Sequence, residues 1–275
     1  MEQKQQSLVR YFIRLSYDGS TFNGWQRQSG NVPTVQKEIE EALSLLLRQE
    51  IIIVGAGRTD TGVHAREYYA HLDVPGALKE FSAHQIAYKL NRMLPPQVAV
   101  QGIMPVTAQA HARFSAISRT YHYHITTRKD PFERGRAWLF EPKLDICSMQ
   151  QAADVLLEHK DFACFSKSNT QVNTTICEVM KARWQKEGHL LVFEIKANRF
   201  LRNMVRAIVG TLVEVGLGKT SQQEFAGILA SGDRKKAGYS VPGHGLFLTD
   251  IEYPGDIWLP ERNAGHQGII GEICP

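Results

Sequence analysis

Hydrophobic periodicity marks the same order of strands and helices twice along this 275-residue chain. In the first half, alternating or continuous apolar residues predict strands over residues 9–17, 51–54, 67–74 and 98–104. Two helices with apolar stripes separate these strands. Thr34 can cap the first helix, and Ser82 with Gln85 forms a capping-box pattern before the second. The first half therefore has the order β-α-β-β-α-β.

The second half repeats this order with different residues. Its strands are expected over residues 119–127, 176–185, 189–197 and 246–253. Its helices are expected near residues 148–159 and 199–215, with an added helix near 222–231. Because β-α-β-β-α-β is the ferredoxin-like order, we predict an α+β protein with two ferredoxin-like (βαββαβ) halves. Their antiparallel-rich sheets would be joined side by side, with the functional cleft between them.

The hand-over between the halves is expected within residues 107–114. This gives an N-terminal domain over residues 1–110 and a C-terminal domain over residues 111–275, the latter with the added helix and a tail. Each length is sufficient for a folding unit with its own core.

Composition and charge indicate an ordinary globular protein. Hydrophobic residues make up 43% of the chain and charged residues 22%, which excludes disordered and collagen-like proteins. The formal net charge of +4 permits a polyanionic partner without requiring one. The polar first seven residues indicate no secretory signal, no apolar stretch reaches the length of a membrane span, and the four cysteines form no C-x-x-C pair. We expect a cytoplasmic protein with no membrane partner.

The most unusual segment is the glycine-bounded loop GAGRTDTGVHA over residues 55–65. It matches neither a dinucleotide fingerprint nor a Walker loop. Its glycines allow a sharp turn around Asp60 and a close approach to a ligand, while Arg58 and His64 place polar groups near the carboxylate. This composition suits a nucleophilic or charge-stabilising aspartate near a phosphate. The alternative is a tight surface turn with a local Arg58–Asp60 ion pair.

Three arginines follow a helical spacing near the start of the helix expected at 199–215. Arg199, Arg202 and Arg206 are three and four residues apart, so they would share a stripe. The stripe becomes apolar after Arg206, which predicts that this side chain is half-buried and paired with a carboxylate, for which Asp60 is a candidate. The alternative is an arginine that extends its head to solvent at a helix edge.

The strand RTYHYH over residues 119–124 places Tyr121 and Tyr123 on one face and two histidines on the other. A ring beside basic residues is suited to stacking on an unpaired base. The alternative is two core tyrosines and two surface histidines. We expect no metal site, because no third ligand is evident near these histidines.

Two further features would suit a nucleic acid. The loop YDGSTFNGWQRQ over residues 17–28 contains glycines, amides and two aromatic residues. It could contact RNA, or it could be a structured loop with its tryptophan packed underneath. Basic residues cluster in the segments 113–136, with six against two acids, and 196–206, with four and no acid. These clusters could follow a phosphate backbone.

In combination, these segments resemble the tRNA pseudouridine synthase A (TruA) family. The resemblance extends from residue 9 to residue 253 and is most specific in the loop at 55–65. The segments that carry it are YDGSTFNGWQRQ (17–28), TVQKEIEEAL (34–43), GAGRTDTGVHA (55–65), RFSAISRTYHYHI (113–125), FLRNMVRAIVGTLVEVGLGK (200–219) and GLFLTDIEY (245–253).

The resemblance implies a pseudouridine synthase fold and an isomerase that converts uridine to pseudouridine at positions 38 to 40 of the tRNA anticodon stem-loop. It implies no cofactor or metal and a homodimer with the RNA lying across both subunits. It places the catalytic nucleophile at Asp60, the active-site tyrosine at Tyr121 and the arginine that pairs with the aspartate at Arg206. These types of residue suit the chemistry, whether Asp60 adds to the ribose or promotes glycal formation.

The resemblance also places further contacts with the RNA. Substrate-binding residues are expected at Arg58, Thr59, His64, Tyr121 and Leu246. Contacts to the RNA backbone are expected from Arg27, Arg113, Arg119, Arg199 and Arg202.

The sequence departs from the common family pattern at Arg202-Asn203, at 173–175 and at 241–244, near the expected substrate contacts. The tail from 254 to 275 lies outside the resemblance.

Two other functions compete with RNA isomerisation. One is a catalytically idle RNA-binding or RNA-folding protein on the same scaffold, against which the intact Asp60, Tyr121 and Arg206 argue. The other is a carboxylate-dependent hydrolase or glycosidase. It is disfavoured because no second carboxylate lies near Asp60 in the sequence, although folding could supply one.

Overall fold

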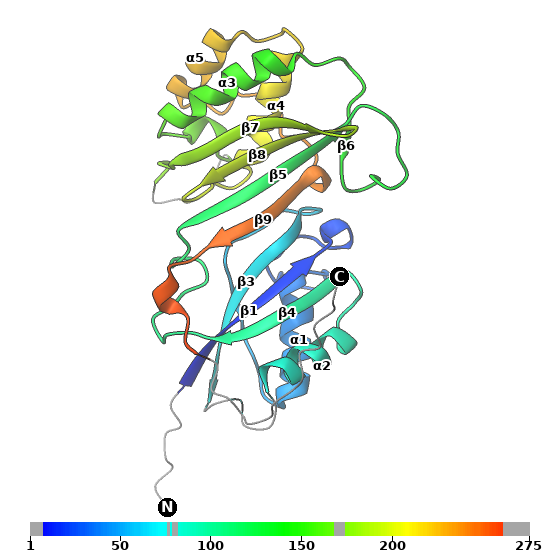
Figure 1. Cartoon of the computed structure of the whole chain (residues 1–275), viewed down its shortest axis with the longest axis vertical. Coiled ribbons are helices and arrows are strands. Elements are labelled where there is room, and N and C mark those ends of the chain that lie inside the picture. Colours follow the sequence, from blue (N-terminus) through cyan, green and yellow to red (C-terminus); the bar gives the residue numbers. More distant parts are fainter. Residues whose placement is uncertain (1–7, 76–77, 79–81, 168–173, 261–275) are drawn as a thin grey trace, which may run out of the picture.

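One continuous sheet runs through both halves of the molecule (Figure 1). The computed structural model describes residues 8–75, 78, 82–167 and 174–260. Within these residues the main path of the sheet has the order β4-β1-β3-β9-β5-β8-β7, with β2 paired to β3 and β6 paired to β5. The structure is therefore an α+β protein, as predicted.

The first half has the predicted order of elements. These are β1 (Leu8–Tyr17), α1 (Val35–Leu47), β2 (Val54–Gly55), β3 (His64–Pro75), α2 (Ala83–Met93) and β4 (Val98–Pro105). Both neighbours of β1 in the sheet, β3 and β4, run antiparallel to it. When the four strands are numbered along the chain, their spatial order is fourth, first, third and second. Helix α1 connects β1 to β2, and helix α2 connects β3 to β4.

The second half repeats the arrangement. Its elements are β5 (Ser118–Thr126), β6 (Trp138–Leu139), α3 (Ile146–Glu158), β7 (Val179–Glu187), β8 (Leu190–Ala197), α4 (Met204–Gly216), α5 (Gln222–Ser231) and β9 (Leu246–Glu252). The strands β9-β5-β8-β7 again follow the order fourth, first, third and second. The short β6 and the added helix α5 lie outside this repeat.

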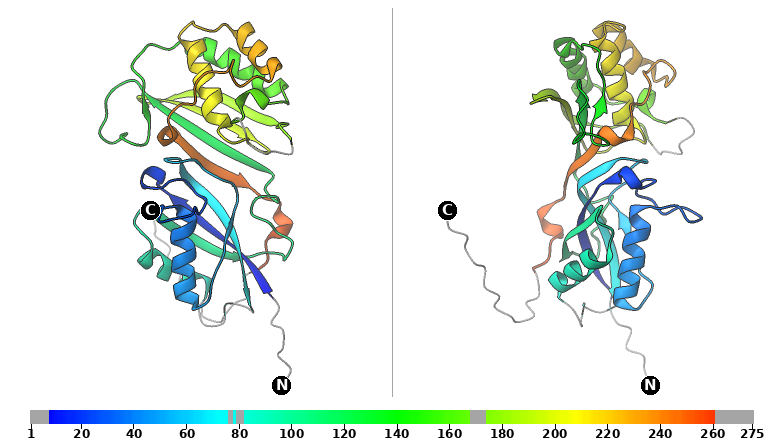
Figure 2. Two further views of the ribbon diagram at one scale, coloured as in Figure 1. Left: turned by 180° about the vertical axis from the view of Figure 1, so that it is seen from behind. Right: turned by 90° about the vertical axis from the view of Figure 1, so that its right-hand side faces the viewer.

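A short parallel pairing joins the two halves. His64 of β3 lies opposite Phe247 of β9, and Ala65 lies opposite Leu248. Figure 2 shows α1 and α4 on the same side of the resulting sheet. Because the loop that precedes β3 lies at this junction, residues 55–63 are held at the boundary between the halves.

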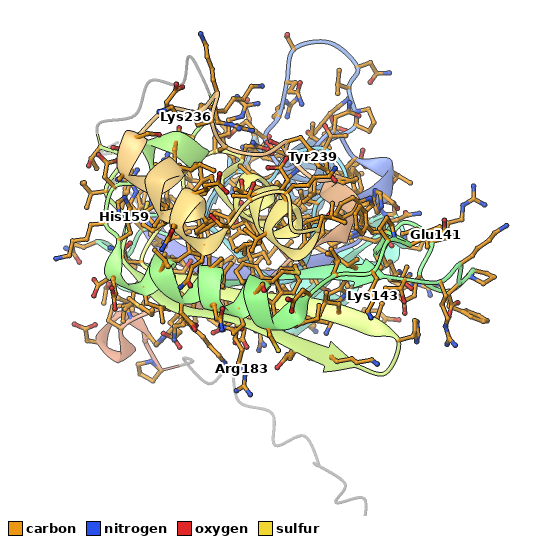
Figure 3. The ribbon with its side chains drawn as sticks, turned by 90° about the horizontal axis from the view of Figure 1, so that it is seen from above. Glu141, Lys143, His159, Arg183, Lys236 and Tyr239 are labelled. Atoms are coloured by element: carbon orange, nitrogen blue, oxygen red, sulfur yellow. The ribbon has the colours of Figure 1, made fainter. Side chains whose placement is uncertain are left out.

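Each half has its own hydrophobic core. The first core includes Phe12, Leu15, Ile39, Leu43 and Tyr68. The second includes Ile125, Phe165, Phe193, Ile208 and Leu212. On β7, Ala182 and Trp184 are buried against α3, whereas Arg183 between them points away from the helices (Figure 3). The face of the sheet that turns away from the helices is thus open at β7, whereas in the first half Tyr253 and Trp258 cover it by packing on Phe12.

Some residues of each half pack in the core of the other half. Leu248, Ile251 and Ile257 follow β9 or lie on it, yet they pack in the first core. Val63 of the first half packs in the second core. The division into domains at residues 110 and 111 stays a prediction, and these contacts show that the halves are tied by packing as well as by the sheet.

The start of α4 differs from the prediction. We expected this helix from about Arg199, but it begins at Met204, and Asn203 before it has a left-handed backbone with φ +69°. A residue in that conformation cannot continue a right-handed helix. Arg199 and Arg202 therefore precede the helix, and the predicted stripe of three arginines on one helix face is wrong. Arg206 alone of the three lies on α4.

The two predicted N-terminal caps behave differently. Ser82 and Gln85 form the predicted capping box of α2, with both reciprocal hydrogen bonds. Thr34 occupies the N-cap of α1, but its side chain makes no capping hydrogen bond and its hydroxyl is buried. At this end of α1 a backbone N–H group bonds to another part of the chain instead, since the Gln36 N–H donates to the carbonyl of Trp25 at 3.0 Å.

Some predictions concern the chain's ends and gaps. None of the described helices has the length and hydropathy of a membrane span. Residues 254–260 return to the first half, where Trp258 forms a bridge with Val106. Residues 261–275 of the predicted tail and Asn173 of the segment 173–175 lie outside the described residues.

Candidate active site between the halves

A cleft of about 850 Å³ opens between the two halves. Its first wall comes from the loops at 17–28 and 55–65, and its second wall from segments around α4. The ionisable side chains that line it are Arg58, Lys167, Arg202, Arg206, Arg234 and Asp60. One carboxylate thus faces five cations, a composition that attracts a polyanion.

Asp60 is held by contacts between the two glycine-containing loops. The Thr59 hydroxyl forms a hydrogen bond of 2.9 Å with the phenol of Tyr17, and the Trp25 backbone N–H donates to the Thr59 carbonyl at 3.3 Å. The Val63 N–H closes the turn on the Asp60 carbonyl at 3.2 Å. These bonds fix the backbone on both sides of Asp60, so its carboxylate has a defined place in the cleft.

Glycine is required where the loops approach each other. Gly24 has φ +92°, and a Cβ there would lie 2.4 Å from the Thr59 carbonyl oxygen. Gly62 has φ +77°, which permits the turn after Asp60. The sequence argument that glycines around Asp60 allow a sharp turn therefore applies at Gly62, while Gly24 provides the close contact between the loops.

Arg206 connects the second half to Asp60. Its Nη1 donates to the Asp60 Oδ2 at 3.0 Å, and its Nε donates to the Val241 carbonyl at 2.7 Å. Both side chains are partly buried, with 21% of Arg206 and 26% of Asp60 exposed. The ion pair that we predicted is present, and it spans 146 residues of sequence. The Asp60 carboxylate pairs with Arg206 rather than with Arg58 in its own loop.

A second guanidinium approaches the other oxygen of the same carboxylate. The Arg202 Nε lies 3.7 Å from the Asp60 Oδ1, and 54% of the Arg202 side chain is exposed. This distance is that of an ion pair without a hydrogen bond. Asp60 thus lies between two cations that differ greatly in how firmly they are held.

Tyr121 lies on β5 and packs against both cores. Its ring meets Phe200 edge-on, with centroids 5.1 Å apart. Burial raises the pKa of its phenol to about 12, with a further contribution from the Asp60 charge, while Arg119 opposes the shift. The phenol is therefore neutral at physiological pH. Tyr123, by contrast, is fully buried in the second core and bonds to the Pro242 carbonyl at 2.9 Å.

His64 and Leu246 are both buried. The Gly19 N–H donates to the His64 Nδ1 at 3.0 Å, while its Nε2 lies 2.9 Å from the Gly135 carbonyl oxygen and 3.1 Å from that of His244. Burial lowers the pKa of this imidazole, so the neutral ring serves as an anchor for the loops around it. The predicted substrate contact would require His64 to leave these partners. Leu246 packs in the second core.

The arginines predicted to contact the RNA backbone have different surroundings. Arg27 is paired with Glu40 at 3.0 Å and Glu41 at 3.8 Å. Arg113 is exposed and lies over the ring of Phe114. Both therefore present charge at the surface, although that of Arg27 is matched by carboxylates.

Arg119 ties the halves together. Its guanidinium donates to the carbonyls of Ala56 and Asn198, each at 3.0 Å, and to that of Arg113. Burial lowers its pKa, because the charged guanidinium loses contact with water. Arg199 is partly buried near Cys177. Neither lines the cleft among the residues described there.

Three cleft residues lie outside every segment that the sequence analysis singled out, namely Lys167, Arg234 and Ser240. In the loop at 17–28, Phe22 and Trp25 are buried as one of the two alternatives predicted, while its amides face the cleft and its contact with RNA stays a prediction. Arg234, which is held by the carbonyls of Ala237 and Gly238, was missed because only the folded chain brings it into the cleft that Asp60 also lines.

No metal ligand set accompanies these residues. Within the described part of the chain, no group of three or more His, Cys, Asp or Glu side chains could hold a metal ion. The predicted histidine pair on β5 includes His124, which is buried and stacks on Phe247.

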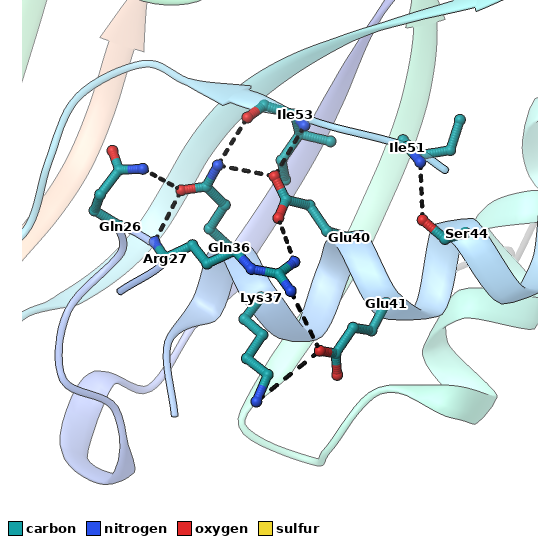
Figure 4. Close-up of polar contacts among 9 residues, drawn as sticks. All are labelled: Gln26, Arg27, Gln36, Lys37, Glu40, Glu41, Ser44, Ile51 and Ile53. Atoms are coloured by element: carbon teal, nitrogen blue, oxygen red, sulfur yellow. Dashed lines mark hydrogen bonds and ion pairs between the residues drawn. The ribbon is translucent and has the colours of Figure 1, made fainter. Parts of the chain in front are cut away.

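The buried carboxylate of Glu40 bonds the loop at 17–28 and the segment that precedes the loop at 55–65 (Figure 4). Glu40 of α1, with 5% of its side chain exposed, accepts hydrogen bonds from the Ile53 N–H at 3.1 Å and from Gln36 at 2.9 Å. Its other oxygen pairs with Arg27 at 3.0 Å. Gln36 in turn bonds the backbone of Arg27 and the side chain of Gln26. The network connects the loop at 17–28 to the segment that leads into the Asp60 loop.

We expect Glu40→Gln to lower the free energy of unfolding by about 2 kcal/mol, because an amide NH₂ would face a donor that now meets an oxygen. Urea denaturation followed by tryptophan fluorescence measures the change. The neighbouring Glu41, with 54% of its side chain exposed, provides a matched control, and Glu41→Gln should stay within about 0.5 kcal/mol of wild type. Equal effects of the two substitutions would contradict the assigned role of Glu40.

Comparison with known proteins adds evidence of relationship. Residues 152–254 match the family model described as tRNA pseudouridine synthase. The chain is 50% identical over 252 residues to tRNA pseudouridine synthase A of Parabacteroides distasonis, which covers 92% of this chain and 99% of the relative. It is 48% identical over 254 residues to the Porphyromonas gingivalis protein of the same name, covering 92% and 100%. It is also 48% identical over 271 residues to that of Bacteroides thetaiotaomicron, covering 98% of each.

Proposed function

The chain belongs to the tRNA pseudouridine synthase A family, and we infer from this that it isomerises uridine to pseudouridine in tRNA, with Asp60 as the catalytic carboxylate. The observation that supports this assignment most strongly is the Asp60–Arg206 pair in a cleft lined by four further cations. An idle RNA-binding protein would not require a carboxylate at the centre of a surface that binds phosphates.

The reaction requires no net reagent. The bond between N1 of uracil and C1′ of ribose breaks, a bond between C5 and C1′ forms, and a proton leaves C5 while N1 gains one. An ionised carboxylate serves the step at C1′ either by adding to it or by stabilising the charge that develops there. Arg206 would orient the Asp60 carboxylate, because its Nη1 donates to the Oδ2 while its own Nε is fixed to the Val241 carbonyl.

The target base must leave the stacked stem to reach Asp60. Tyr121, beside the cleft, would stack on the freed base. Because its phenol is neutral, it could transfer the C5 proton only as a relay that passes on its own O–H proton while it accepts the new one. Arg58 is exposed at the cleft and would hold the phosphate of the flipped nucleotide, with Thr59 and Asp60 in the same loop.

We place the substrate uridines at positions 38 to 40 of the anticodon arm, on the family resemblance. The resemblance also supports a homodimer with the RNA across both subunits, which would present each cleft with basic residues from two chains. A tRNA substrate would place the protein in the cytoplasm. The reaction chemistry needs no cofactor or metal.

Unmodified tRNA transcripts incubated with the protein test this proposal. We expect new pseudouridine at positions 38, 39 or 40 in wild-type reactions, mapped by carbodiimide-dependent primer extension. EDTA is added once the RNA has been folded, because the reaction is expected to need no metal ion. Sedimentation of the protein with and without tRNA reports the oligomeric state. Transcripts that show no new pseudouridine would sink the enzymatic assignment, and modification confined to another arm would correct the substrate site.

A further inference from the structure

The two cations on Asp60 differ in how they are anchored. Arg206 is one-fifth exposed and fixed at two points, by the Asp60 Oδ2 and the Val241 carbonyl. Arg202 is more than half exposed and stands 3.7 Å from the Asp60 Oδ1. In the described part of the chain, no hydrogen bond holds the Arg202 guanidinium. One cation is therefore a fixed part of the site, and the other is free to exchange partners.

The backbone of Arg202 is firmly placed, so any exchange involves the side chain alone. Its carbonyl accepts a hydrogen bond from the Lys167 N–H at 3.1 Å. The preceding Leu201 is buried in the second core, and the following Asn203 bonds the hydroxyl of Ser240. Arg202 thus has a long flexible side chain on a rigid base at the mouth of the cleft.

Arg202 places a positive charge beside the Asp60 oxygen that Arg206 does not bond. A carboxylate oxygen that attacks C1′, or stabilises charge there, must turn a lone pair toward the sugar. Arg206 occupies the Oδ2, and Arg202 lies against the Oδ1. Phosphate is a better partner for a guanidinium than a distant carboxylate, since it accepts two parallel charge-assisted hydrogen bonds.

We propose that Arg202 is a positioning residue that covers the Asp60 Oδ1 in the free enzyme and moves to a backbone phosphate when RNA binds. This inference rests on the proposed function, because the RNA supplies the competing anion. RNA binding would uncover the reactive oxygen while Arg206 keeps the carboxylate in place. The Asp60 nucleophile would be free of its second cation only in the presence of substrate.

A double-mutant cycle in tRNA affinity tests the exchange. Wild type, Asp60→Asn, Arg202→Met and the double variant are titrated with labelled tRNA transcribed with pseudouridine in place of uridine, which none of them can turn over. If RNA must take Arg202 from Asp60, Asp60→Asn lowers the Kd by about two- to fivefold, the range of exposed ion pairs. In the Arg202→Met background the same substitution leaves the Kd unchanged.

A fixed Arg202 gives the opposite result. It would screen the Asp60 charge from the RNA, so Asp60→Asn would tighten binding at least as much when Arg202 is absent. That outcome, or no effect of Asp60→Asn in either background, would overturn the proposal. Arg183→Met on the open face of the sheet is the control background (Figure 3), in which the Asp60→Asn effect must equal that in wild type.

A folding control and a rate measurement complete the test. Circular dichroism and thermal melting of all four proteins show whether each is folded. A fall in single-turnover rate for Arg202→Met as large as that for Arg206→Met would also overturn the proposal, because it would make Arg202 a fixed support. Pseudouridine formation by wild type tests the proposed function independently, so an active enzyme with additive binding effects would refute the Arg202 exchange alone.

Discussion

Asp60→Asn will reduce pseudouridine formation by at least about 10⁴-fold under single-turnover conditions, because the amide has no charge with which to attack or stabilise C1′. The substitution keeps the size of the side chain and an oxygen that can accept from Arg206. The turn that carries the residue is held by backbone and Thr59 contacts that do not involve the carboxylate. We therefore expect the variant to fold and to bind tRNA at least as well as wild type.

The measurement is tritium release from tRNA labelled at C5 of uridine, in a single turnover with enzyme in excess. Asp256→Asn is the matched control, since Asp256 is an exposed aspartate that does not line the cleft, and it should retain wild-type rates. Substantial activity in Asp60→Asn with normal tRNA binding would show that another group performs the chemistry at C1′.

Arg206→Met will slow the same reaction by about 100- to 1,000-fold, the usual effect of removing one well-placed electrostatic contact from an active site. Methionine keeps much of the apolar stem but loses the bonds to the Asp60 Oδ2 and to the Val241 carbonyl. Asp60 would then lose the hydrogen bond that orients its carboxylate in the cleft. Arg206→Lys should recover only part of the rate, because one ammonium cannot reach both partners in the geometry of the guanidinium.

Arg183→Met serves as the control for removing an arginine, because Arg183 lies on the open face of the sheet (Figure 3). Thermal melting shows whether Arg206→Met remains folded at the assay temperature, and tRNA titration shows whether it still binds substrate. A folded, tRNA-binding Arg206→Met that retains the wild-type rate would exclude Arg206 from the positioning of Asp60.

Much of the fold could be predicted from the sequence because it depends on local patterns. The alternation in β1 and β5, and the capping box of α2, are formed by neighbouring residues that determine which local structure buries apolar surface. The predicted start of α4 was wrong, because the residue spacing there is compatible with a helix and also with an irregular segment. The arginine spacing at 199–206 is helical, but the left-handed backbone at Asn203 delays α4 until Met204. Asparagine adopts a left-handed backbone more readily than most non-glycine residues, but few asparagines do so, and Asn203 alone did not predict the break.

The sequence by itself determined the repeated order of elements and the glycine-bounded loop around Asp60, and it offered Asp60 as one possible partner for Arg206. Only the tertiary structure decided which cations meet that carboxylate and how firmly each is held. The parallel pairing of β3 with β9 brings α4 opposite the Asp60 loop, across 146 residues of sequence. The same folding turns Arg119 inward as a tie between the halves and leaves Arg202 exposed over the Oδ1. These differences arise because the environment of a charged side chain depends on distant segments that pack around it, which residue spacing does not encode.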